Sequence, residues 1–163
     1  MTIRSTRKPA TVAVCIVFIL VFSSPRMRAQ FAGTAAITIP ETQLLQPQAL
    51  HTLLQASGAE KPLILQVGSH VLYAEGHIPG SEYVGPGSQS AGLRQLQDRV
   101  SSLPRKKFIV LYCGCCPWIR CPNVGAAFAK MHAMGFTNVK VLYLADNFGT
   151  DWASKGYPVE QGR

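Results

Sequence analysis

Residues 108–123 read FIVLYCGCCPWIRCPN, and this stretch holds four of the five cysteines of the chain. Its first five residues are aromatic, β-branched or otherwise apolar, so they predict a buried strand, and Cys113 follows that strand directly. The other cysteines of the stretch are Cys115, Cys116 and Cys121. So many thiols in so short a segment favour reactive or metal-ligating sulfur over a disulfide or buried pair that only holds a loop.

The segment after these cysteines predicts a helix, so the thiols are expected in a loop between a strand and a helix. Apolar residues recur at helical spacing from Val124 to Met131, and Gly135 ends the pattern. Backbone N–H groups and the helix N-terminus would then point at sulfur. Such surroundings favour the thiolate, which is the reactive form of cysteine.

Strands and helices alternate along the rest of the chain. The expected elements are a helix over residues 46–56, a strand over 62–67, a helical turn over 70–75, a helix over 93–103, a strand over 139–144 and a short helix within 146–155. This alternation is typical of an α/β fold with a mainly parallel sheet and helices on both faces. Reactive loops in such folds follow the carboxyl ends of strands, which is where Cys113 lies.

The first 29 residues have the pattern of an export signal. A cationic stretch at residues 4–8 precedes an uncharged apolar run over 10–22, and Ala29 offers a small residue for cleavage. The run is short for a membrane span, which needs about 20 residues. We therefore expect export to the periplasm or the extracellular space, with membrane attachment only through an uncleaved leader. Cys15 lies within the apolar run and is expected to be inert.

Charge and length set further bounds on the remaining chain. Five of the sixteen basic residues lie in the leader and all eight acidic residues follow it, so the formal charge of +8 falls to +3. This excess is too small to indicate a nucleic-acid partner. Residues 30–40 predict a linker, and residues 41–160 suit a single domain, which we expect to be a monomer.

Two separated stretches resemble the rhodanese-like (sulfurtransferase) domain family. Residues 62–81, PLILQVGSHVLYAEGHIPGS, match a strand, a helical turn and the GHIPG turn of the family. Residues 108–159 match a strand ending in Tyr-Cys, a reactive loop, a helix, the segment GFTNV at 135–139 and a late tryptophan, Trp152. The resemblance implies a single rhodanese-like α/β domain with Cys113 in its active loop.

The active loop departs from the family pattern in length and in its number of thiols. The family's loop runs from a cysteine through four residues to an arginine, whereas Cys113 precedes Arg120 by seven positions. Cys115 keeps the family's spacing to Arg120 but lies two residues beyond the expected place. We prefer Cys113 as the nucleophile because the strand end determines its position, with Cys115 and Cys116 as alternates.

A second departure lies beside the first strand of the resemblance. Family members usually carry Asp and Arg where this chain has Gln66 and Gly68. The substitution removes an acid–base pair that would help to anchor the neighbouring loop.

The resemblance implies transfer of sulfane sulfur by a thiosulfate-type sulfurtransferase. A thiolate attacks a small donor such as thiosulfate, a cysteine persulfide forms, and an acceptor thiol takes the sulfur. Arg120 would contact the anionic donor and Trp118 would form a wall of its site. This interpretation needs neither a cofactor nor a metal.

Two alternatives rest on the same cysteines. Cys113 and Cys116 form a C-x-x-C pair after a strand, as in thiol–disulfide oxidoreductases, and Cys116 or Cys121 could resolve an oxidised Cys113 into a disulfide. The pattern C-x-C-C-x4-C could instead hold Zn²⁺ or Cu⁺ in a non-enzymatic soft-metal-binding module.

Overall fold

The computed structural model describes residues 2, 38–58 and 60–162. Apart from residue 2, the predicted export signal lies outside these residues, as do residues 30–37 of the predicted linker. No helix in the described part of the chain is long and apolar enough to cross a membrane.

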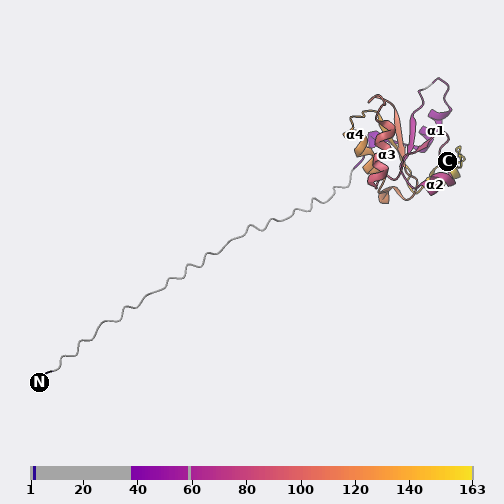
Figure 1. The fold of residues 1–163 in the computed structure, drawn as a ribbon. Coiled ribbons are helices and arrows are strands. Elements are labelled where there is room, and N and C mark those ends of the chain that lie inside the picture. Colours follow the sequence, from indigo (N-terminus) through magenta and orange to yellow (C-terminus); the bar gives the residue numbers. More distant parts are fainter. Residues whose placement is uncertain (1, 3–37, 59, 163) are drawn as a thin grey trace. The chain divides into compact units, whose positions relative to one another are not determined.

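A five-stranded parallel sheet with strand order β1-β5-β4-β2-β3 forms the centre of the fold (Figure 1). The strands are β1 (Leu44–Leu45), β2 (Leu63–Gln66), β3 (Glu82–Tyr83), β4 (Ile109–Tyr112) and β5 (Val139–Leu142). The central strand β4 pairs with β2 and β5, and all four of its residues are buried. A strand buried on both faces is typical of parallel sheets. The predicted fold class is therefore confirmed.

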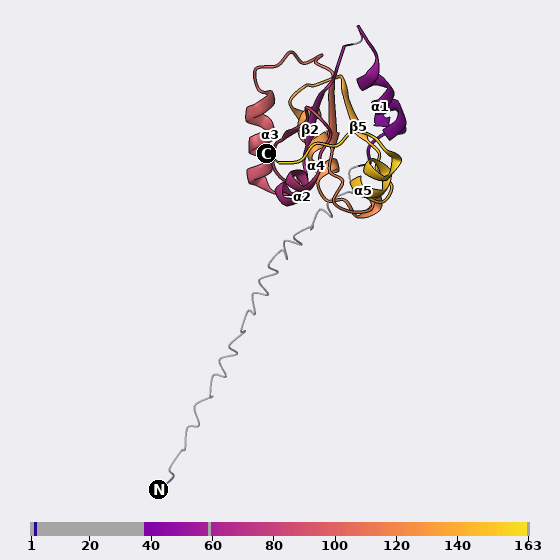
Figure 2. The ribbon, with the colours of Figure 1, turned by 90° about the vertical axis from the view of Figure 1, so that its right-hand side faces the viewer.

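Helices cover both faces of this sheet. They are α1 (Pro47–Gln55), α2 (His70–Glu75), α3 (Ser90–Val100), α4 (Val124–Ala133) and α5 (Phe148–Asp151), with 3₁₀ turns at Glu41–Gln43, Trp118–Arg120 and Ala153–Lys155. Figure 2 shows α3 and α1 on opposite sides of β2 and β5. Alternate residues of β4 serve the two faces: Leu111 packs in the cluster that includes residues of α3 and α4, and Tyr112 packs with Leu50 of α1 and Trp152.

Most predicted elements are confirmed, with differences at their ends. The helix predicted from residue 93 begins at Ser90. The sequence did not indicate its first turn, because this turn packs against Pro86 through Gly92 and has no large apolar side chain. The strands β1 and β3 were not predicted. Each has two residues at an edge of the sheet, too few to show an alternating pattern.

Candidate functional site

The cysteine loop leaves the carboxyl end of β4 and leads into α4. Cys113 is the first residue after β4 and is only 4% exposed, because it belongs to the core cluster under α3 and α4. The next two cysteines, Cys115 and Cys116, and then Cys121 are partly exposed. All four are free thiols. The predicted position of Cys113 at the end of a buried strand is therefore observed.

The sulfur atoms of the loop are in contact with one another. The Sγ of Cys115 lies 3.0 Å from that of Cys113 and 3.1 Å from that of Cys116. The Sγ atoms of Cys113, Cys115 and Cys121 all lie within 4.8 Å of one another. Cys115 therefore contacts both members of the predicted pair, Cys113 and Cys116.

Asn123, which precedes α4, is a site residue that the sequence did not indicate. Its side chain is buried, and its Nδ2 lies 3.2 Å from the Sγ of Cys113 and 3.8 Å from the Sγ of Cys115. Its Oδ1 accepts a hydrogen bond from the backbone N–H of Ser88 at 3.0 Å. The amide therefore donates to the sulfurs while the loop before α3 determines its orientation. An asparagine before a helix normally indicates only a cap.

The environment of Cys121 favours its thiolate. The pKa of Cys121 is lowered to about 6, chiefly because the Cys113 thiol donates a hydrogen bond to its sulfur. The backbone N–H groups of Val124 and Asn123, at the start of α4, also donate to this sulfur and lower the pKa further, although partial burial opposes them. Donors at a helix N-terminus stabilise negative charge on sulfur.

The environments of Cys113 and Cys116 favour the protonated thiol. The pKa of Cys113 is raised, first because its proton is held in the hydrogen bond to Cys121 and second because the side chain is buried. The pKa of Cys116 is raised to about 12, mainly by burial and then by hydrogen bonding with Cys115. Of these three thiols, Cys121 is therefore the one that loses its proton most readily.

Gln66 and Gly68, at and just after the end of β2, contact the cysteine loop at Cys113. The buried Gln66 donates from Nε2 to the carbonyl oxygen of Cys113 at 3.1 Å, and its Oε1 accepts from the N–H of Gly68 at 3.0 Å. A Cβ at position 68 would lie 2.8 Å from the Sγ of Cys113. The two departures from the family pattern therefore act together. The neutral amide of Gln66 holds both the loop after β2 and the cysteine loop, and Gly68 leaves room for the Cys113 sulfur.

Two cavities reach the sulfurs. A very small one of about 10 Å³ is lined by three of the thiols (Cys113, Cys116 and Cys121) together with Trp118 and apolar side chains from the loop, α4 and the end of β5. An open groove of about 660 Å³ is lined by Cys115 and Cys116 and by residues that include Leu72, Phe148 and Val159. The groove gives access to the outer thiols, whereas the small cavity holds at most one atom.

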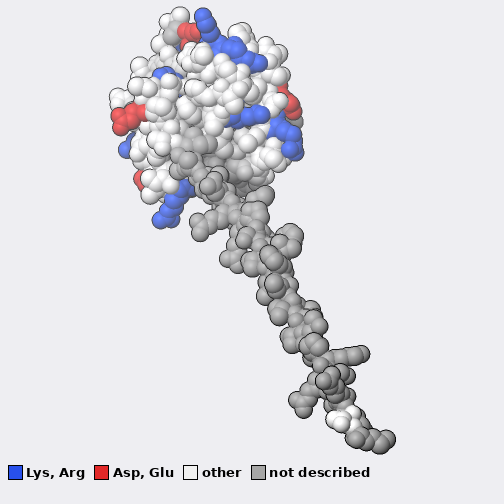
Figure 3. All heavy atoms as spheres, turned by 90° about the vertical axis from the view of Figure 1, so that its left-hand side faces the viewer, with Lys and Arg blue, Asp and Glu red and all other residues white. Residues whose placement is uncertain are grey.

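The two predicted substrate contacts, Trp118 and Arg120, lie in the same 3₁₀ turn but differ in their relation to these cavities. Trp118 lines the small cavity, and its ring packs 5.1 Å from that of Tyr143. Arg120 is exposed and is not among the residues that line either cavity. The face drawn in Figure 3 shows Lys and Arg side chains in small groups among uncharged residues.

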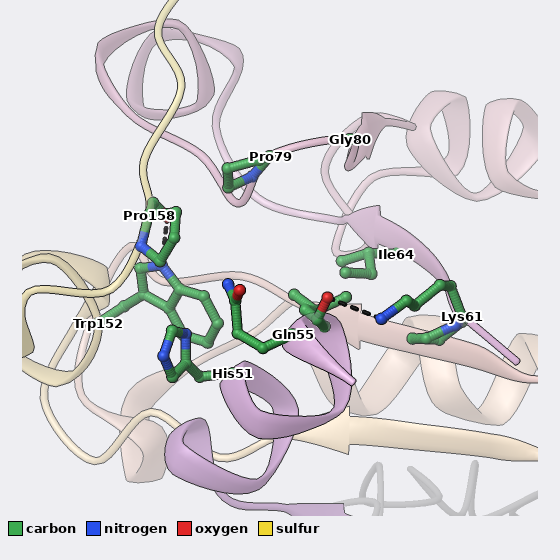
Figure 4. Close-up of a pocket in the computed structure, with 10 residues that line it drawn as sticks. His51, Gln55, Lys61, Ile64, Pro79, Gly80, Trp152 and Pro158 are labelled. Atoms are coloured by element: carbon green, nitrogen blue, oxygen red, sulfur yellow. Dashed lines mark hydrogen bonds between the residues drawn. The ribbon is translucent and has the colours of Figure 1, made fainter. Parts of the chain in front are cut away.

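A further cavity of about 340 Å³ lies beside α1 and the start of β2 (Figure 4). His51 and Trp152 line it together with Lys61, whose Nζ donates to three carbonyl groups at the end of α1. The Nδ1 of His51 is buried and finds no hydrogen-bond partner among the described residues. None of the residues that line this cavity is a cysteine, so it plays no part in the sulfur site.

Comparison with known proteins gives the following similarities. The family model of the rhodanese-like domain matches residues 48–144. The rhodanese-like domain of an Anabaena sp. protein is 24% identical with a TM-score of 0.56, over 73% of this chain and 79% of that one. A Bacillus halodurans protein is 26% identical with a TM-score of 0.55, over 72% of this chain and 75% of that one.

A thiosulfate sulfurtransferase from Pseudomonas aeruginosa is 24% identical with a TM-score of 0.50, over 74% of this chain but 19% of that much longer one. These solved structures share the fold of the chain. No curated protein gives a significant match to the sequence.

Proposed function

The chain belongs to the rhodanese-like domain family, and we propose that it is an enzyme that transfers sulfane sulfur through a persulfide on the cysteine loop. One observation carries the proposal: free thiols gather at the carboxyl end of β4, and the pKa of one of them, Cys121, is lowered by its hydrogen bond with Cys113 and by donors at the start of α4. A thiolate is the form of cysteine that attacks a sulfur donor. The thiosulfate sulfurtransferase of Pseudomonas aeruginosa, which shares the fold, is consistent with this chemistry.

The transfer needs two displacement steps. The thiolate attacks the outer sulfur of thiosulfate, the sulfur–sulfur bond of the donor breaks, and sulfite leaves with the bonding electron pair. An acceptor thiolate then attacks the outer sulfur of the cysteine persulfide. The bond between the two persulfide sulfurs breaks, the enzyme thiolate is restored, and the acceptor carries the sulfur away.

We assign the attacking thiolate to Cys121. The sequence favours Cys113, but that side chain is 4% exposed, and Gly68 lies close against its sulfur. Cys121 is partly exposed and accepts the hydrogen bonds that stabilise the charge. In this assignment the Cys113 thiol is a hydrogen-bond donor to the nucleophile. The N–H groups of α4 attract the donor anion in place of the role predicted for Arg120.

Mass spectrometry of the reduced protein after thiosulfate treatment tests both sulfur transfer itself and the assignment of the nucleophile to Cys121. Each cysteine is mapped for a gain of one sulfur atom, in the wild type and in the Cys113→Ser and Cys121→Ser variants. We expect the gain on Cys121, retained in Cys113→Ser and lost in Cys121→Ser. Loading of Cys113 alone would restore the assignment made from the sequence. Failure of every cysteine to gain sulfur, from thiosulfate or an organic persulfide, would contradict sulfur transfer.

A thiol–disulfide relay is the second candidate function. It is favoured by the 3.0 Å separation of the Cys113 and Cys115 sulfurs, from which a small approach would form a disulfide. The two-electron oxidation requires a disulfide partner, which is reduced in exchange. Equilibration in glutathione buffers with disulfide mapping tests it. A Cys113–Cys115 disulfide that forms reversibly, without sulfur loading by thiosulfate, would favour the relay over the transferase.

The cellular setting is proposed from the leader and the family. We propose that the protein is exported to the periplasm or extracellular space, acts as a monomer, and passes sulfur from a small donor to a thiol acceptor. Cell fractionation with N-terminal sequencing of the recovered protein tests the first point. A mature N-terminus near residue 30 is expected, and a full-length chain in the cytosol would contradict export.

A further inference from the structure

We propose that Cys113, Cys115 and Cys121 form a binding site for one soft metal ion, which we assign as Cu⁺. Their Sγ atoms lie within 4.8 Å of one another, and they come from a single loop whose ends β4 and α4 hold. A trigonal ion about 2.3 Å from each sulfur would place the sulfurs about 4 Å apart. Side-chain rotations that move each sulfur by about 1 Å therefore suffice to close the set on an ion.

The groups around the three sulfurs suit thiolate ligands. Asn123 points its Nδ2 at the sulfurs of Cys113 and Cys115, at 3.2 Å and 3.8 Å. Cys121 lies two residues before Asn123, the residue that precedes α4, so it is close in the chain to the free N–H groups of that helix. Donors of this kind orient metal-bound thiolates and offset their negative charge. The cluster thus has an outer layer of neutral donors that would stabilise a site with more thiolates than metal charge.

The adjoining cavity has the size and polarity of a site for a single atom. Its volume is about 10 Å³. Cys113 and Cys121 of the proposed set line it together with Cys116, whereas Cys115 does not border it, and its other walls include the side chains of Val124, Leu142 and Leu144. A space of this size accommodates about one water-sized sphere. Apolar walls favour an ion held by covalent-like bonds to sulfur over a hydrated one, so the site selects a thiophilic ion.

Ligand type and number favour Cu⁺ over Zn²⁺. Thiolates bind both ions, but structural zinc sites take four protein ligands in a tetrahedron. Three sulfurs form the mutually close group here, and no His, Asp or Glu of the described residues joins it. Cu⁺ is satisfied by three thiolates. Cys116 contacts Cys115 and lines both the small cavity and the groove, but its Sγ is not part of the mutually close group, so we leave it outside the ligand set.

The inference goes beyond sulfur transfer and can fail independently of it. The metal and the persulfide use the same sulfur atoms, so one chain cannot hold both at once. Binding displaces thiol protons and changes no oxidation state, because copper is supplied as Cu⁺. Metal uptake and sulfur loading are therefore measured on separate samples of the same reduced, metal-free protein.

The test is an anaerobic titration of this protein with Cu⁺ in the presence of bicinchoninate. This chelator competes for Cu⁺, and the colour of its complex reports the Cu⁺ that the protein does not hold. We expect one Cu⁺ per chain and, by X-ray absorption, three sulfur neighbours at about 2.3 Å. The variants Cys113→Ser, Cys115→Ser and Cys121→Ser should each weaken binding by more than about 100-fold, and Asn123→Ala by about 10-fold. The matched control Cys116→Ser should bind as the wild type does. Circular dichroism checks that each variant is folded.

Three outcomes would overturn the proposal. The first is complete loss of Cu⁺ to bicinchoninate while the protein still gains sulfur from thiosulfate, which would leave the transferase standing alone. The second is a loss of affinity in Cys116→Ser as large as that in Cys121→Ser. The third is tight binding of Zn²⁺ with four sulfur neighbours, which would replace the trigonal site by a tetrahedral one.

Discussion

Cys121 should be the most reactive thiol of the protein in weakly acidic solution. Its pKa of about 6 leaves about 25% of it as thiolate at pH 5.5, whereas an ordinary cysteine with a pKa of about 8.5 is about 0.1% thiolate. The thiolate population thus favours Cys121 by about 240-fold. A less basic thiolate is also a weaker nucleophile, and a Brønsted slope of about 0.45 over this pKa difference costs about 13-fold. The net advantage at pH 5.5 is therefore about 20-fold.

The same calculation predicts that the advantage fades as the pH rises. At pH 7, Cys121 is about 90% thiolate and an ordinary cysteine about 3%, so the net advantage falls to about twofold. Pulse alkylation with iodoacetamide at several pH values, followed by peptide mapping, measures the rate at each cysteine. The rate at Cys121 should reach its plateau above about pH 7, because its pKa is lowered from the ordinary range.

The Cys113→Ser variant separates the causes of this reactivity. The thiol of Cys113 is the largest cause of the lowered pKa, and a hydroxyl can donate to the same sulfur, so the pH midpoint should move little. Cys113→Ala removes the donor, and the midpoint should move upward toward the ordinary range. Faster alkylation of Cys113 than of Cys121 in the wild type, or a Cys121 rate that rises only above about pH 8, would refute the reasoning.

Three further predictions concern the groups that hold the loop. Gly68→Ala places a Cβ 2.8 Å from the sulfur of Cys113 and should lower the free energy of unfolding by about 1–3 kcal/mol in urea denaturation; an unchanged midpoint would mean that the loop moves freely. Gln66→Leu leaves the N–H of Gly68 without its acceptor, and urea denaturation should again show a loss of about 1–3 kcal/mol. Tyr112→Phe removes the hydroxyl that accepts from the backbone N–H of Ile78, and hydrogen exchange at that N–H should accelerate by about 10-fold or more; unchanged protection would contradict the role of this hydroxyl in holding the GHIPG turn.

The Tyr112 hydroxyl connects the GHIPG turn to the end of β4. The hydroxyl of Tyr112, at the end of β4, contacts the N–H of Ile78 at 3.2 Å and the hydroxyl of Ser81 at 3.1 Å. The two stretches by which the sequence resembles the rhodanese-like family therefore meet across the sheet. Each stretch is short, and their contact explains why the pair of them is a more specific signal than either alone.

Local patterns were sufficient for the main elements. The apolar run over residues 108–112 predicted a strand that proved to be β4, and the helical spacing from Val124 predicted α4. These signals depend on burial of one strand or one helix face, which neighbouring residues in the sequence reveal. The two-residue edge strands β1 and β3 lack such a pattern, because pairing with β5 and β2 is what makes them strands.

The sequence by itself determined the fold class, the family and the place of a thiol-rich loop after the central strand, because these follow from periodicity and from short motifs. Only the tertiary structure decided how the four thiols differ. Their charges depend on burial and on hydrogen-bond donors, which include the other thiols of the loop and Asn123 at the start of α4. The strand end that made Cys113 the predicted nucleophile also buries it, and the hydrogen bond with Cys113, together with donors at the start of α4, lowers the pKa of Cys121 instead.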